Sequence, residues 1–495
     1  MFKKYYLLVK SLSITCLLIV SACTVGPDYK KPDAPITESF KEMNGWKQAE
    51  PRDDLPKGKW WESYQDPVLN DLMTRVNLNN QNIIAAQAQY RQALSLIQAA
   101  QASYFPSLGL NAGQTNSSTM NSGGKINTDI GIGLSASWVP DFWGQIRRTV
   151  ESNKANAQAS AASLEAASLL VRTTLAQTYF QLRIADMQQK LYEDTVAAYK
   201  KSLEITKNQL KAGIANNLDV SQAETLLHST EALAVDIGIA RAQYEHAIAV
   251  LVGVPPATFS IQKETFSIDP QTGLINSSAT KLLANLPNVP VGLPAQLLER
   301  RPDIANAERL MAAANAKVGV ARAAFFPSIS ISATGGYQAG ALPGLMSAPN
   351  QIWSIGPNLN LPIFDGGARL AASDQAKAAY EQSVAIYRQT VLSAFQNVED
   401  NLIALKLLED ETKIQKSAVE SARNATRISL NQYKAGIVNY LTVVTSQATQ
   451  LNNERSLMNI LNRRFIAHIG LIASIGGDWN IEQDEKIQKI KLKTN

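Results

Sequence analysis

The sequence predicts an α+β membrane protein made of two copies of one module, each with a β-hairpin between long helices. Three observations lead to this prediction: short motifs that return after 221 to 223 residues, four segments in which apolar residues alternate with small polar ones, and long helical stretches without internal proline or glycine. Internal repeats decide the architecture of such a chain.

The clearest repeated motif is a turn between two helices. Residues 212–218 (AGIANNL) return as 435–441 (AGIVNYL). Each copy follows a long helical stretch, and Gly213 and Gly436 can adopt the left-handed conformation that ends a helix. Two further pairs of motifs share nearly the same offset: YFPSL at 104–108 with FFPSI at 325–329, and VPDFWG at 139–144 with LPIFDG at 361–366. The chain is therefore predicted to hold two modules of about 220 residues.

These landmarks set the expected boundaries. Residues 1–22 are expected to be a signal peptide and 23–66 an extended N-terminal arm. The parts expected of the first repeat, 67–253, are a helix at about 67–103, a β-hairpin at 105–139, a long helix at 144–211, a tip at 212–217 and a helix at 218–252. Those of the second repeat, 302–475, are a helix to about 325, a β-hairpin at 326–362, a long helix at 366–434, a tip at 435–440 and a helix at 441–470. The remaining segments are an equatorial insertion at 254–301 and a C-terminal tail at 476–495.

The first residues have the pattern of an export signal. Lys3 and Lys4 precede a short apolar segment, and Val20-Ser21-Ala22-Cys23 resembles a bacterial lipobox. The resemblance implies cleavage before Cys23 and acylation of its sulfur and amino group, and Thr24 at the next position indicates the outer membrane. The alternative, an uncleaved membrane helix, is disfavoured because the apolar segment is too short to span a bilayer comfortably.

Four segments between the helices are predicted to be β-strands: 107–113, 128–138, 328–334 and 354–361. Their period of two gives one apolar face and one small, polar face. This pattern suits a membrane barrel whose apolar face meets lipid, and it equally suits a soluble, half-buried sheet. Export of the chain favours the barrel. Four strands are too few to close one, since single-chain barrels begin at eight, so several chains would have to share it.

The helices at 144–211 and 366–434 have no proline or glycine in their interiors. At 1.5 Å per residue each would span roughly 100 Å, a length that requires packing along the whole helix. Near the tips, alternating spacings of three and four residues predict a coiled-coil seam. The expected seam positions are Val220, Ala223, Leu227, Thr230, Ala234 and Ile237 in the first repeat, and Leu441, Val444, Ala448, Leu451, Arg455 and Met458 in the second.

The composition argues against several classes of function. Without the three lysines of residues 1–22, 44 basic residues stand against 42 acidic ones, a net charge of +2, which is no nucleic-acid-binding signature. Two cysteines, Cys16 and Cys23, exclude a disulfide framework and a cysteine metal site. The three histidines lie far apart. No nucleophile motif, metal-ligand spacing or phosphate loop is present, so we expect no catalytic residue, no metal and no cofactor.

The chain resembles the TolC-type outer-membrane factors, in the lipoprotein branch that serves resistance-nodulation-division (RND) efflux pumps. The motifs that carry the resemblance are CTVGPDYKKP at 23–32 and LERRPDI at 298–304, followed by Ala307 and Glu308. The resemblance covers essentially the whole mature chain. It implies a homotrimer with a 12-stranded barrel in the outer membrane, continuous with a periplasmic barrel of 12 helices. The implied partners are a periplasmic adaptor protein, an inner-membrane RND transporter and outer-membrane lipid.

The resemblance also implies that the tips form a periplasmic gate. The tip residues concerned are Ala212, Gly213, Gly436, Asn439 and Tyr440. Thr445 stands where the family usually has the aspartate of an acidic ring that constricts the mouth, so this chain departs from the pattern there. Asp219, which aligns with Thr442 in the repeat, is a candidate for acidic lining, and a solvated aspartate at a helix start explains it equally well.

Two classes of function remain. The first is a passive, gated outer-membrane exit duct for small toxic compounds, lipid-anchored and with a large periplasmic portion. The second is a lipoprotein enzyme or a purely structural coiled coil, which the missing catalytic constellation and the four alternating strands argue against. Within the first class, the outer-membrane duct of a type I protein secretion system is the alternative, and lipidation argues mildly against it.

Overall fold

A computed structural model describes residues 25–37, 39–43, 59–118, 126–264, 267–268, 275–276, 286 and 301–477. The predictions for the signal peptide, for Cys23 and Thr24, for most of the insertion and for nearly all of the tail fall outside these ranges. The chain divides into two compact units. One comprises Met1–Ala34, Ala88–Ala162 and Ala305–Thr390, and the other Pro35–Gln87, Ser163–Ile304 and Val391–Asn495.

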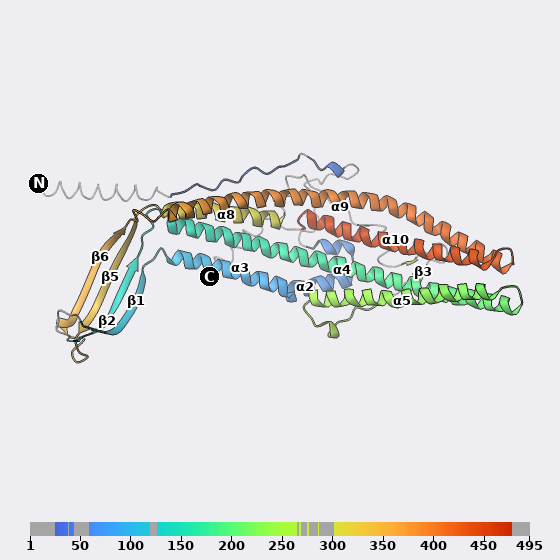
Figure 1. The fold of residues 1–495 in the computed structure, drawn as a ribbon, viewed down its shortest axis with the longest axis horizontal. Helices are drawn as coiled ribbons and strands as arrows, with labels where there is room; N and C mark the ends of the chain where they lie inside the picture. Colours follow the sequence, from blue (N-terminus) through green and yellow to red (C-terminus); the bar gives the residue numbers. More distant parts are fainter. Residues whose placement is uncertain are drawn as a thin grey trace. The chain divides into compact units, whose positions relative to one another are not determined.

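The first unit contains an antiparallel sheet of four strands in the order β1-β2-β5-β6 (Figure 1). The strands are β1 (Ser107–Ser117), β2 (Asn127–Trp138), β5 (Ser328–Ala339) and β6 (Gln351–Asn360). Each repeat contributes one hairpin, and pairing of β2 with β5 joins the two hairpins. Within the described part of the chain, β1 and β6 each keep one unpaired edge.

The pairing register collects the apolar side chains on one face of the sheet. Leu110 stands opposite Leu134, which stands opposite Gly335, which stands opposite Trp353. Residues that face each other across antiparallel strands point to the same side, so this row lies on one face. Leu110 is 69% and Trp353 74% exposed. The sheet thus carries an apolar face whose side chains stay largely uncovered by the described part of the chain.

The opposite face of the sheet is small and polar. It carries alternate residues such as Gly109, Asn111, Ser135, Thr334 and Ser354. Asn111 donates to the Ser135 hydroxyl at 2.8 Å, and the hydroxyls of Thr334 and Ser354 are 2.7 Å apart. These contacts satisfy polar groups across neighbouring strands while leaving the face open to water.

The long helices are α2 (Pro67–Asn79), α3 (Gln81–Ala102), α4 (Gln145–Lys211), α5 (Asn217–Leu251), α8 (Pro302–Ala323), α9 (Ala368–Lys434) and α10 (Tyr440–Ser474). The short elements are 3-10 turns at Lys41–Met43, Trp60–Tyr64, Pro256–Thr258 and Ala348–Asn350, and strands β3 (Ser267–Ile268) and β4 (Ile275–Asn276). None of the described helices is both long and apolar enough to cross a membrane.

The expected continuous helix at 67–103 is wrong, because it is interrupted at Asn80. The backbone there is extended, with φ −66° and ψ 122°. The Asn80 side chain accepts hydrogen bonds from the backbone N–H groups of Asn82 and Ile83, which is how an N-cap starts a new helix. Its amide also donates to the carbonyl of Leu251 at 2.7 Å. The break therefore fastens the start of α3 to the end of α5.

The main hydrophobic core lies in the second unit. Its centre is aromatic: the rings of Phe180 in α4 and Phe465 in α10 stack at 4.2 Å, and Tyr64 meets Phe180 edge to face. All three side chains are buried. Burying each such ring contributes about 2 kcal/mol or more, and aromatic pairing adds to this. This core fixes the helices from which the tips project.

The coiled-coil seam of the second repeat differs from the expectation next to the tip, whereas the expected Leu451 and Met458 are buried. In α5 the expected residues Ala223, Leu227 and Thr230 are buried. In α10, by contrast, Leu441 is 52% exposed, and the buried set near the tip is Tyr440, Val443, Gln447, Leu451, Glu454, Leu457 and Met458. The Tyr440 ring packs against Tyr433 at 5.0 Å, and the buried face of α10 begins at Tyr440, one residue before the expected Leu441. The buried polar residues Gln447 and Glu454 were not among the expected seam positions.

Candidate functional site at the helix tips

Two glycines end the long helices at the tips. Gly213 and Gly436 have φ values of +73° and +72°. The backbone N–H of Ile214 donates to the carbonyl of Gln209, and that of Ile437 to Gln432, each at 2.9 Å. These are the bonds of a Schellman turn, which needs a left-handed residue. A Cβ at either glycine would meet no atom within 4 Å. Glycine is therefore favoured by the left-handed backbone conformation and not by a lack of room for a side chain.

Two asparagines start the next helices. Asn216 accepts a hydrogen bond from the backbone N–H of Asp219 at 2.9 Å, and the Asp219 carboxylate accepts from the backbone N–H of Asn216 at 3.1 Å. This is a reciprocal capping box. Asn439 accepts from both the backbone N–H and the hydroxyl of Thr442. One oxygen of the candidate gate residue Asp219 is therefore engaged in capping its own helix.

Tyr440 links the two repeats just inside the tips. Its side chain is only 1% exposed, and its hydroxyl lies 3.2 Å from that of Ser202 in α4. Burial raises the pKa of the Tyr440 phenol above its ordinary value. Tyr199, one turn before Ser202, donates to the carbonyl of Gln447 at 3.0 Å. These buried bonds hold α4 of the first repeat against α10 of the second.

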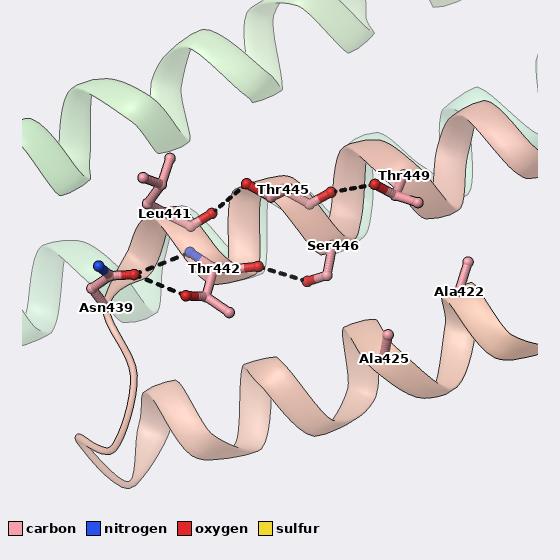
Figure 2. Close-up of a pocket in the computed structure, with 8 residues that line it drawn as sticks. All are labelled: Ala422, Ala425, Asn439, Leu441, Thr442, Thr445, Ser446 and Thr449. Atoms are coloured by element: carbon pink, nitrogen blue, oxygen red, sulfur yellow. Dashed lines mark hydrogen bonds between the residues drawn. The ribbon is translucent and has the colours of Figure 1, made fainter.

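A groove runs between α9 and α10 beside the second tip (Figure 2). It encloses about 530 Å³, and its lining residues are Ala422, Ala425, Asn439, Leu441, Thr442, Thr445, Ser446 and Thr449. The hydroxyls of Thr445 and Thr449 donate to carbonyls of their own helix, at 2.9 and 2.8 Å. No ionisable side chain lines the groove. It offers a shallow surface of methyl and hydroxyl groups to another helix.

Ion pairs join the two helices of each hairpin. Lys207 of α4 lies 2.8 Å from Glu224 of α5, and Arg423 of α9 lies 2.6 Å from Glu454 of α10. The hydrogen bond from Lys207 lowers the pKa of Glu224. The first pair is exposed, so water and salt weaken it, whereas the Glu454 side chain is buried. Of these two ion pairs, the one between Arg423 and Glu454 in the second repeat is therefore the stronger.

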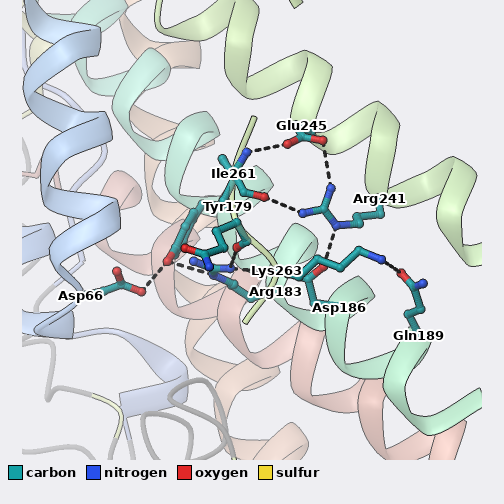
Figure 3. Close-up of polar contacts among 10 residues, drawn as sticks. Asp66, Tyr179, Arg183, Asp186, Gln189, Arg241, Glu245, Ile261 and Lys263 are labelled. Carbon is teal, nitrogen blue, oxygen red and sulfur yellow. Dashed lines mark hydrogen bonds and ion pairs between the residues drawn. The ribbon is translucent and has the colours of Figure 1, made fainter. Parts of the chain in front are cut away.

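A buried ionic network lies further from the tips, where the equatorial insertion leaves α5 (Figure 3). Arg241 of α5 donates to Asp186 of α4 at 2.7 Å, to Glu245 at 2.9 Å and to the carbonyl of Ile261 at 2.7 Å. Glu245 also accepts from the backbone N–H of Ile261. Arg183 donates to the carbonyl of Gln262 at 3.0 Å. The insertion is thus held through its backbone to both helices.

The sequence did not predict this network. Its only sequence signal is charge at helical spacing, Arg183 with Asp186 and Arg241 with Glu245, inside otherwise apolar helix faces. Such i,i+3 and i,i+4 pairs are common on exposed helix surfaces, so they do not by themselves indicate burial.

The sequence-predicted gate residues lie at both tips. Ala212, Gly213 and Asp219 are in the first, Gly436, Asn439 and Tyr440 in the second, and Thr445 in the groove next to it. Cys23 lies outside the described residues. Within the described ranges, no group of three or more His, Cys, Asp or Glu residues is placed to hold a metal ion.

Comparison with known proteins identifies the family. The family model described as outer membrane efflux protein matches residues 72–254 and 293–477. The chain belongs to this family. The two matched stretches are the two repeats, each with one hairpin of the sheet and one helical tip.

Individual relatives of this efflux protein match nearly end to end. The cation efflux system protein CusC of Escherichia coli is 28% identical, covering 95% of this chain and 99% of its own. The probable efflux pump outer membrane protein TtgC of Pseudomonas putida is also 28% identical, with 98% of each chain covered. The solved structure of the outer-membrane channel OprN superposes with a TM-score of 0.82 at 27% identity, covering 92% of this chain and 99% of that chain.

Proposed function

We propose that this efflux protein is the passive, gated exit duct of a tripartite efflux system, through which an inner-membrane RND pump expels small toxic compounds. The observation that carries the proposal is the sheet: an exposed apolar face, a small polar face and two unpaired edges. An apolar face of this kind suits lipid, and a polar face suits water. The relatives CusC and TtgC, named for efflux, favour this function over type I protein secretion.

Three copies of the chain would close the barrel. The strands alternate in direction along the order β1-β2-β5-β6. With an even number of strands, β6 of one copy meets β1 of the next in antiparallel orientation, as in every other pair of the sheet. Three copies supply 12 strands, an even number within the range of bacterial barrels. Closure would pair both free edges and remove their liability to aggregate.

The helix tips are the proposed periplasmic gate. In this proposal the residues at the mouth are Ala212, Gly213, Asp219, Gly436, Asn439, Tyr440 and Thr445. The uncharged groove beside Thr445 is the proposed contact for helices of the periplasmic adaptor, because small side chains permit close helix packing. The bond between Tyr440 and Ser202 and the pair of Lys207 with Glu224 would hold the mouth closed until the adaptor docks.

Acylation of Cys23 is the proposed second attachment to the outer membrane. The lipobox supports it, and Val25, two residues later, is already fixed to the unit that carries the sheet, since its N–H donates to the carbonyl of Trp143 at 3.2 Å. The barrel and the acyl chains would then enter the same membrane. No bond chemistry and no cofactor is part of the proposed function.

Single-channel conductance in a planar bilayer, with the mass of the detergent-extracted protein, tests the duct. We expect a trimer with a small, mostly closed conductance that increases in Tyr440→Phe with Ser202→Ala, which removes the buried bond while keeping both helices. Thr225→Ala is the matched control, because that hydroxyl bonds only to its own helix at Ser221. A monomer that never conducts would refute the shared barrel.

A further inference from the structure

A pocket in the first unit lies between the N-terminal arm, the end of α3, and helices α4 and α8. It encloses about 350 Å³ and is lined by Tyr29, Tyr104, Arg147, Val150, Glu151, Lys154, Ala155, Gln158, Arg309 and Ala312. Val150, Ala155 and Ala312 are buried and form an apolar floor. Three cationic side chains, Arg147, Lys154 and Arg309, stand around it. The acidic Glu151 also lines it, so the pocket combines an apolar base with a rim of three basic residues and one acidic residue.

The arm that forms one wall of this pocket is held in a fixed position. The amide of Asn315 donates to the carbonyl of Pro27 at 3.0 Å. Gly26, at φ +109°, touches the backbone of Gly319 so closely that a Cβ there would lie 2.5 Å from its Cα. The Tyr29 hydroxyl donates to Glu308, and burial together with this bond raises the tyrosine pKa. The wall is built into the fold and does not need a ligand to form.

The acidic groups around the pocket already have partners. The buried Arg148 guanidinium lies 2.8 Å from both Asp28 and Glu151. Glu308 accepts from Tyr29 and pairs with Arg309 at 3.1 Å. Lys154, in contrast, is exposed and has no ion-pair partner among the described residues. An anion in the pocket would meet the Lys154 ammonium without displacing an existing contact.

The pocket lies at the edge of the membrane layer. Tyr104 precedes β1 by three residues, and its carbonyl accepts from the Trp138 indole at the end of β2 at 2.9 Å. Tyrosine and tryptophan gather at membrane interfaces. The arm begins at Cys23, whose acyl chains must enter lipid and not the water-filled duct. If those acyl chains enter the membrane as proposed, the arm and the wall formed by Tyr29 belong to the lipid-facing side of this unit.

We propose that this pocket binds the phosphate-bearing headgroup of a membrane phospholipid. Lys154 contacts the phosphate, Arg147 adds positive potential, and Tyr29 and Tyr104 flank the glycerol region above the apolar floor. A lipid is favoured over free phosphate because the pocket opens beside the proposed lipid-facing sheet and next to the acylated end of the chain. The inference rests on the proposed membrane placement of the sheet.

Native mass spectrometry of the detergent-extracted protein, titrated with phosphatidylglycerol, tests this site. A basic residue near an anionic lipid surface contributes about 1 kcal/mol, so Lys154→Gln should weaken lipid binding about fivefold, the charge reversal Lys154→Glu about 30-fold, and Lys154→Arg little. Lys317→Glu is the matched control, since Lys317 is an exposed lysine of the same unit that does not line the pocket. Inorganic phosphate and glycerol phosphate at the same concentration should not displace the lipid.

Equal loss in Lys154→Glu and Lys317→Glu would overturn the proposal in favour of general electrostatic attraction. Displacement by inorganic phosphate would overturn it in favour of a free-anion site. Unchanged binding in Lys154→Glu would remove the site altogether. Trimer mass and conductance of the same variants separate the two proposals. A normal, conducting trimer with weakened phosphatidylglycerol binding supports the pocket and leaves the proposed duct unaffected. A non-conducting monomer contradicts the duct itself.

Discussion

Replacing Arg241 by methionine tests whether the buried ionic network holds the equatorial insertion. The variant removes three hydrogen bonds and leaves the Asp186 carboxylate, which is 1% exposed, with Arg183 at 3.4 Å as its remaining ion pair. Deleting one partner of a buried pair costs about 3–5 kcal/mol. The remaining contact with Arg183 places the expected cost near the lower end, at about 3 kcal/mol.

Hydrogen exchange of the Ile261 amide measures this cost locally. That N–H donates to Glu245, which Arg241 orients. About 3 kcal/mol of lost local stability corresponds to roughly 100-fold faster exchange in peptides that contain residues 259–264. The matched control is Lys190→Met in α4, which breaks a half-exposed pair with Asp194 and should change exchange there less than about fivefold.

Two results would refute the reasoning. Exchange of the Ile261 amide that rises less than threefold in Arg241→Met would mean that the network does not hold the insertion. An equal rise in Arg241→Met and Lys190→Met would mean that loss of any charge on these helices loosens them. Adding Asp186→Asn to Arg241→Met should recover part of the loss, because the buried carboxylate is then neutral.

Four further predictions concern the tips, the anchor and the sheet. Gly436→Asp costs about 1–2 kcal/mol of backbone strain without a clash, so trimer amounts should persist. Because the substitution places a charge at the proposed gate, dye efflux in cells should nevertheless fall, and normal efflux would contradict the gate. Cys23→Ala should reduce outer-membrane retention in cell fractions but leave trimers intact, and soluble monomer would count against a barrel. Ile355→Lys on the apolar face should cost about 2–4 kcal/mol in thermal unfolding within lipid, whereas Ser354→Lys on the polar face should be tolerated; equal effects would contradict the assigned faces. The pKa of Glu224 is lowered in the folded protein, so its ion pair stabilises the α4–α5 hairpin at neutral pH and is lost as the pH falls below 4.5, seen as faster exchange near the first tip; pH-independent exchange would exclude a role for the pair.

The fold class could be predicted because its determinants are local or repeated. The glycines at positions 213 and 436, the alternation in residues 128–138 and the absence of helix breakers each need only neighbouring residues. The interruption at Asn80 could not be predicted in this way. An asparagine within a helical stretch becomes a break only when its side chain caps the next helix and bonds to Leu251, far away in sequence.

The candidate sites divide in the same manner. The positions of Asn216 and Asn439 as caps follow from residue type and spacing. The pairing of Arg241 with Asp186 does not follow in this way, because Arg241 lies 55 residues after Asp186, on the other helix of the hairpin. Many exposed charged residues also occur at the i,i+3 and i,i+4 spacings that these residues show within their own helices. The first part of the α10 seam could not be predicted for a related reason: the burial of Tyr440 depends on Tyr433 and Ser202, which only the folded hairpins bring together.

The pairing of β2 with β5 has a consequence for the origin of the molecule. This contact joins the hairpin of the first repeat to that of the second, and proposed closure through β6 and β1 would join neighbouring copies by the same antiparallel pairing. One kind of edge contact would therefore occur six times around the ring, three times within chains and three times between them. An ancestral chain with a single repeat could have formed the same ring as a hexamer, and gene duplication with fusion would then have halved the number of subunits without adding a new type of contact.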